Sequence, residues 1–129
     1  MILVDTSLWI GHLRTGHAAL ARLLERGLVL GHPWVIGELA LGHLTQRREI
    51  IGLLTSLPRA TVATTDEVLT LVGRHQLDGL GIGYVDAQLL AATRLTADAA
   101  LWTADRRLVA AASRLGCAVD PEAPTVDKQ

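Results

Sequence analysis

Four acidic residues stand where the chain could assemble a metal-dependent site, namely Asp5, Glu38, Asp86 and Asp105. Asp5 follows the apolar run 1–4, and Asp105 follows a second, mostly apolar run at 101–104. Carboxylates placed just after the strands of a parallel sheet lie at its carboxyl edge, where α/β folds bind ligands. Four carboxylates without counter-charge raise each other's pKa, so a divalent cation is their expected partner. The pattern therefore points to hydrolysis of a phosphodiester.

Strand and helix signals alternate along the chain and would carry these acids to one place. Short apolar runs predict strands at 1–4, 28–30, 61–63, 101–103 and 118–119. Helical spacing predicts helices over about 6–13, 20–26, 33–44, 47–57, 64–75, 84–95 and 105–115. The first of these helices is expected to be capped by Thr6 or Ser7, and Thr64 with Glu67 predicts a capping box. This order of elements implies right-handed crossovers and a three-layer α/β/α sandwich.

Each acid also has a purely structural interpretation. Asp5 could cap the first helix by accepting backbone N–H groups, and Asp105 could cap the last one. Glu38 lies at the border of an apolar helix face, where a partly exposed surface carboxylate is common. Asp86 opens an otherwise apolar helix, where an unpaired carboxylate is costly unless something binds it. The four positions taken together are harder to explain structurally than any one of them alone.

Length and composition bound the remaining possibilities. The chain has 129 residues, half of them apolar, which predicts one domain over 1–120 and a short polar tail over 121–129. No apolar stretch approaches the roughly 18–20 residues of a membrane span, and Asp5 comes too early for a secretory signal. A cytoplasmic protein without membrane contact is therefore expected. Cys117 is the single cysteine, which excludes an internal disulfide and a cysteine zinc cluster. The net charge of −1 is not that of a general nucleic-acid binder, although eleven of the twelve basic residues are arginines.

Four sequence blocks resemble the PIN-domain ribonucleases and, within them, the VapC toxins of bacterial toxin-antitoxin pairs. The blocks are residues 2–10, the helix of Glu38, residues 86–92 and residues 101–108. The resemblance implies a three-layer sandwich around a mostly parallel five-stranded sheet, and a Mg²⁺- or Mn²⁺-dependent endoribonuclease. It also implies RNA as substrate, a homodimer, and inhibition by a small VapB-type antitoxin. By position, the acidic quartet is Asp5, Glu38, Asp86 and Asp105, with Thr6, Ser7 and Thr103 as neighbouring hydroxyls.

Other readings of the same residues remain open at this stage. A phosphoacceptor receiver domain also clusters aspartates, but it needs a lysine near the sheet edge, and Lys128 in the tail is the only lysine. A catalytically silent binding module with this fold is a second alternative, and a deoxyribonuclease is a third. The helix over 47–57 presents more apolar area than one helix of so small a domain readily buries. That excess predicts a dimer interface or an antitoxin groove there.

Overall fold

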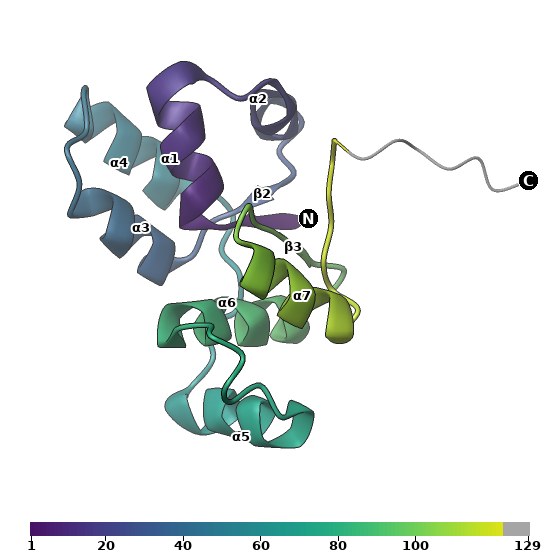
Figure 1. Cartoon of the computed structure of the whole chain (residues 1–129). Coiled ribbons are helices and arrows are strands. Elements are labelled where there is room, and N and C mark those ends of the chain that lie inside the picture. The colour runs from purple at the N-terminus through teal and green to yellow at the C-terminus, as the bar shows by residue number, and fades with distance from the viewer. Residues whose placement is uncertain (123–129) are drawn as a thin grey trace, which may run out of the picture.

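A small parallel sheet lies at the centre of the fold in the computed structural model, which describes residues 1–122 (Figure 1). Strands β1 (Ile2–Val4), β2 (Val29–Leu30) and β3 (Ala100–Trp102) pair in the order β2-β1-β3. Ile2 pairs with Val29 on one side and with Ala100 on the other. The chain thus continues from β1 to a strand on one side and later returns to a strand on the other. The carboxyl ends of β1 and β3 consequently form a topological switch point, the usual ligand position in such sheets.

The parallel α/β sheet is confirmed, but its predicted five strands are not, because the described residues form three strands. Two isolated bridges lie beside the sheet: Arg59, two residues before the expected strand at 61–63, pairs with Gly31, and Ala118, in the expected strand at 118–119, pairs with Leu101. The expected strand at 61–63 makes no bridge, and the Thr61 N–H donates to Thr96 Oγ1 at 2.9 Å instead of to a strand. The last of the expected strands ends at a proline, Pro121, whose nitrogen has no hydrogen to donate.

Helices cover both faces of the sheet. Within the described residues they are α1 (Thr6–Thr15), α2 (Ala18–Glu25), α3 (Pro33–Ala40), α4 (Arg47–Ser56), α5 (Thr65–His75), α6 (Tyr84–Leu95) and α7 (Arg106–Arg114). In Figure 1, α1 to α4 lie on one side of the strands and α5 to α7 lie on the other. Contacts place α6 against β3 and α5 against α6. The apolar sequence of α6 follows from this position, because residues 87–93 are all buried.

Most helix ends agree with the local sequence signals, with two corrections. The capping box of Thr64 and Glu67 is present at the start of α5. Helix α3 ends at Ala40 instead of continuing to residue 44, and Arg47 Nη2 donates to the freed Ala40 carbonyl at 2.6 Å. The residue before α1 is Asp5, so neither Thr6 nor Ser7 is its cap.

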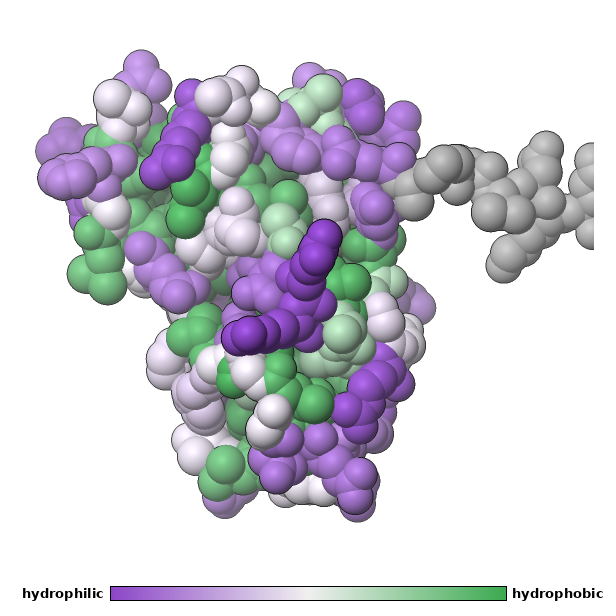
Figure 2. Space-filling model, viewed as in Figure 1, coloured by the Kyte–Doolittle hydropathy of each residue, from purple (hydrophilic) through white to green (hydrophobic). Residues whose placement is uncertain are grey.

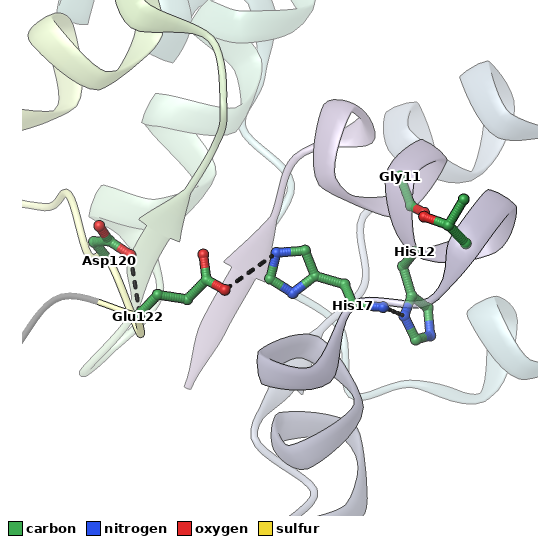
Figure 3. Close-up of polar contacts among 6 residues, drawn as sticks. Gly11, His12, His17, Asp120 and Glu122 are labelled. Atoms are coloured by element: carbon green, nitrogen blue, oxygen red, sulfur yellow. Dashed lines mark hydrogen bonds and ion pairs between the residues drawn. The ribbon is translucent and has the colours of Figure 1, made fainter.

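The last described residues return to the turn between α1 and α2. Figure 3 shows His17 between two partners, because its backbone N–H donates to His12 Nδ1 (3.0 Å) and its Nε2 lies 3.6 Å from Glu122 Oε1. The His17 ring also packs edge-on against Trp102 at 5.2 Å between centroids. Burial, and then the neighbouring His17, lower the pKa of His12. Most of the predicted tail, residues 123–129, lies outside the described residues.

No helix in the described part of the chain combines the length and the apolar character needed to cross a membrane.

Candidate active site

Asp5 lies at the carboxyl end of the central strand and is only 6% exposed. Its backbone N–H donates to the Trp102 carbonyl (2.9 Å), so the residue still belongs to the ladder between β1 and β3. Although Asp5 precedes α1, its carboxylate makes no capping hydrogen bond. The structural interpretation of Asp5 as a helix cap is therefore wrong. A buried carboxylate that stabilises no helix end requires another explanation.

Two hydroxyls hold one oxygen of that carboxylate in place. Ser7 Oγ and Thr103 Oγ1 both donate to Asp5 Oδ2, each at 2.8 Å. The same two hydroxyls accept backbone N–H groups of the loop after β3, Ala104 to Ser7 (3.2 Å) and Asp105 to Thr103 (3.0 Å). Because each hydroxyl both donates and accepts, the network ties Asp5 to the turn that carries Asp105. Such secondary hydrogen bonds fix the orientation of a ligating or catalytic carboxylate.

Glu38 comes from α3 and is tied to α1. Thr6 Oγ1 donates to Glu38 Oε1 at 2.7 Å, and the carboxylate is exposed to solvent. The start of α3 is fixed by His32, whose Nδ1 accepts the Trp34 N–H at 3.1 Å. Burial, and then the charge of Arg59, lower the pKa of His32 to about 4. His32 is therefore neutral near pH 7, which leaves Nδ1 free to accept that hydrogen bond.

The electrostatics of Asp86 show that the four acids share one region. Burial raises the pKa of Asp86, and the charges of Asp5, Asp105 and Glu38 raise it further. A hydrogen bond from the Gly83 N–H to Asp86 Oδ2 (3.1 Å) acts in the opposite direction. Like charges shift a pKa only when they are close, so the tertiary fold brings together acids from four separate segments.

Asp105 does cap a helix, as its structural interpretation expected. Its Oδ1 accepts the N–H groups of Arg107 (2.9 Å) and Leu108 (3.2 Å) at the start of α7. This role occupies one carboxylate oxygen and does not exclude a second role for the other. The Arg107 side chain reaches back over the turn before α6, since a Cβ on Gly81 would lie 2.9 Å from Arg107 Nη1. Figure 2 shows strongly hydrophilic side chains over the start of α7.

Each of the four acids keeps one carboxylate oxygen that accepts no hydrogen bond from the described residues. These oxygens are Asp5 Oδ1, Glu38 Oε2, Asp86 Oδ1 and Asp105 Oδ2. Hard divalent cations take oxygen ligands, so the donor set has the right chemistry for Mg²⁺ or Mn²⁺. Within residues 1–122, however, no three acidic, histidine or cysteine side chains are close enough to form a ready-made metal site. Mg²⁺ commonly uses one or two carboxylates and completes its shell with water, so a cation at these residues would have to be held partly through water.

Two features near the acids are not among the features predicted from the sequence. The first is a cavity of about 410 Å³ between α1, α3 and α4, with Glu38 at its border. The second is a contact between the exposed rings of Trp34 and Tyr84, which lie at the starts of α3 and α6. The position of Trp34 near the acids could have been predicted from its spacing, because Trp34 precedes Glu38 by four residues and therefore lies on the same face of the helix.

The fold is that of an α/β protein with a parallel sheet, and residues 2–114 match the PIN domain family. Because this match covers most of the sequence, the chain belongs to the PIN-domain family. Its curated relatives include Ribonuclease VapC32 of Mycobacterium tuberculosis, from the strains CDC 1551 / Oshkosh and ATCC 25618 / H37Rv. Each is 51% identical over 122 residues, which is 95% of this chain and 98% of the relative. No solved structure is significantly similar. The resemblance expected from the four sequence blocks is confirmed.

Proposed function

We propose that this chain is a Mg²⁺- or Mn²⁺-dependent endoribonuclease and the toxin of a VapBC-type pair. The observation that carries the proposal is that the charges of Asp5, Glu38 and Asp105 all act on Asp86, and that each of these four carboxylates keeps one oxygen free of hydrogen bonds from the described residues. Half of the residues are shared with a protein named a ribonuclease over nearly the whole length of both chains, which supports the same activity.

The proposed roles follow from where the free oxygens lie. Asp5, Glu38 and Asp86 would hold the cation, directly or through water, with Asp105 completing a second position or orienting water. A bound divalent cation supplies Lewis acidity, which activates water and offsets the charge that grows on the phosphate during in-line attack. Ser7 and Thr103 keep Asp5 Oδ2 occupied, so that Oδ1 is the oxygen presented to the site. Thr6 does the same for Glu38.

The ends of the RNA products test this mechanism. If water is the nucleophile, cleavage leaves a 5'-phosphate and a 3'-hydroxyl, whereas attack by the RNA 2'-OH leaves a cyclic phosphate. We expect purified protein with Mn²⁺ to give 5'-phosphate ends, detected by a 5'-phosphate-dependent exonuclease and by mass spectrometry. Protein carrying Asp86→Asn, purified identically, controls for contaminating ribonucleases. Cyclic phosphate ends that vanish with this variant would retain the site and reject water as the nucleophile.

The cavity beside Glu38 is our proposed docking site for the antitoxin. Its lining combines apolar side chains with the polar or charged residues Arg14, His43 and Glu38. The apolar lining residues come from α1, α3, α4 and the connection between α3 and α4: Ile10, Leu13, Leu39, Leu44 and Ile50. An amphipathic helix would bury its apolar face there and could place a charged side chain beside the acids. The outer face of α4, with Leu53 42% exposed, is the proposed homodimer surface.

A charge introduced into the cavity should weaken antitoxin binding without affecting the homodimer. Ile10→Asp should weaken binding of the co-expressed antitoxin by tenfold or more, because a buried charge without a partner is costly. The matched control is Leu69→Asp, at an exposed leucine on α5 outside the cavity. Affinity is measured by calorimetry and subunit number by light scattering, and the dimer should persist in both variants. Equal antitoxin affinity in both variants would remove the cavity from the interface. A wild-type monomer at tens of micromolar would contradict the dimer.

A further inference from the structure

Two exposed aromatic rings meet near the acids. The centroids of Trp34 and Tyr84 are 5.8 Å apart and their planes are inclined by 70°, an edge-to-face contact. Both residues are 41% exposed, whereas the other two tryptophans, Trp9 and Trp102, are 1% and 4% exposed. An edge-to-face pair leaves most of the ring faces uncovered by each other. The pair therefore presents aromatic surface to solvent in a chain that has only four aromatic residues of these types.

The pair connects the same two helices that bring Glu38 and Asp86 together. Trp34 precedes Glu38 by four residues on α3, so the two side chains lie on one helix face, about one turn apart. Tyr84 and Asp86 both belong to the first turn of α6. The contact between Trp34 and Tyr84 itself joins the start of α3, the helix of Glu38, to the start of α6, the helix of Asp86. A ligand whose phosphate lies at these acids would therefore have its adjoining groups within reach of the two rings.

The Tyr84 ring is held in place without a ligand, and the Trp34 ring packs against it. The Tyr84 hydroxyl accepts a hydrogen bond from Gln88 Nε2 (3.0 Å), and Gln88 is itself buried at 3% exposure. Gln88 Oε1 has no hydrogen-bond partner among the described residues, so the buried amide makes only its contact with the tyrosine. The backbone N–H of Trp34 donates to His32 Nδ1, which fixes the main chain from which the indole projects. Rings that are already ordered lose little conformational entropy when a flat ligand stacks on them.

We propose that Trp34 and Tyr84 form a stacking site for an unpaired base of single-stranded RNA next to the cleaved phosphate. The inference rests on the proposed ribonuclease function and adds how that site holds its substrate. Sequence-tolerant recognition of single strands uses aromatic faces on which bases stack, because every base has a π face. Exposure of the two rings alone would also suit an interface with a second copy of the protein. Their position beside the acids favours RNA as the ligand of this site.

Tryptophan fluorescence reports on this contact directly, since Trp34 is the exposed indole. The probe is a short oligouridylate in EDTA, where the proposed hydrolysis cannot proceed, compared with a ribose-phosphate oligomer of equal length that lacks bases. We expect the oligouridylate to quench fluorescence and to bind about tenfold more tightly than the abasic oligomer. Trp34→Ala should remove this preference and leave the affinity for the abasic oligomer unchanged. Trp34→Phe keeps an aromatic ring and should retain most of the preference for oligouridylate. The affinity of both variants is measured by fluorescence anisotropy.

The outcomes separate this inference from the function on which it rests. Equal affinity of the wild type for both oligomers, or a Trp34→Ala protein with the wild-type preference, overturns the stacking site even if RNA is cleaved. A dimer that becomes a monomer with Trp34→Ala, together with no quenching by oligouridylate, assigns the rings to a protein interface and also overturns it. Quenching and base preference in a protein that never cuts RNA would uphold the stacking site and reject the ribonuclease. In an active protein, Trp34→Ala should raise KM about tenfold with little change in kcat.

Discussion

Asp5→Asn is expected to slow RNA cleavage on the order of a hundredfold or more while leaving the fold intact. Asparagine keeps the shape of aspartate and an oxygen that can accept from Ser7 or Thr103, so the tie between β1 and the loop after β3 is largely retained. What is lost is the negative charge at the centre of the proposed site. Removal of one charge from a crowded group of carboxylates also relieves repulsion, so the melting temperature should not fall by much. Single-turnover cleavage and thermal unfolding measure the two effects.

Ser7→Ala is the matched control for this experiment. It leaves the Asp5 charge in place and removes one of the two hydrogen bonds to Oδ2. Loss of a group that orients a ligating carboxylate costs about 10- to 100-fold in activity or metal affinity, which is less than the loss expected for the charge itself. Near wild-type cleavage by Asp5→Asn would remove Asp5 from the active site. A larger defect in Ser7→Ala than in Asp5→Asn would mean that loop geometry matters more than charge.

Divalent cations should both activate and stabilise the protein. Ligand at a hundred times its Kd adds about 2.7 kcal/mol to the stability of the folded state, which for a domain of this size raises Tm by about 10 °C. The carboxylates that repel one another without a cation are the source of this binding energy. EDTA is expected to abolish cleavage and to reverse the rise in Tm. Unchanged RNA cleavage in excess chelator would contradict the metal-dependent mechanism.

The raised pKa of Asp86 adds a pH dependence to the same measurement. Because this carboxylate takes up a proton at a higher pH than an ordinary aspartate, protons compete with the cation sooner as the solution is acidified. The rise in Tm caused by Mn²⁺ should therefore shrink as pH falls from neutral. Asp86→Asn provides the control, because its smaller cation effect should lack this component of the pH dependence.

Local signals in the sequence were sufficient for much of the scaffold. The buried strand before Asp5, the capping box at Thr64 and the bounds of α6 all follow from apolar spacing and short-range hydrogen bonding. The number of strands could not be obtained in this way. The β-branched segment at 61–63 has strand character, but Thr96, distant in sequence, takes the Thr61 N–H that a fourth strand would have needed.

The sequence by itself determined which acids could form a site, because Asp5 and Asp105 follow strands, Asp86 opens a helix and Glu38 borders an apolar helix face. Only the tertiary structure decided which oxygen of each acid accepts a hydrogen bond and which oxygen stays free. Thr103 donates a hydrogen bond to Asp5, which is 98 residues away in the sequence, and Thr6 donates one to Glu38, which is 32 residues away. The contact of Trp34 with Tyr84 likewise joins two helices whose starts are about fifty residues apart. Local propensity extends over a few residues, whereas these contacts depend on helix packing around the sheet and were therefore beyond prediction from spacing alone.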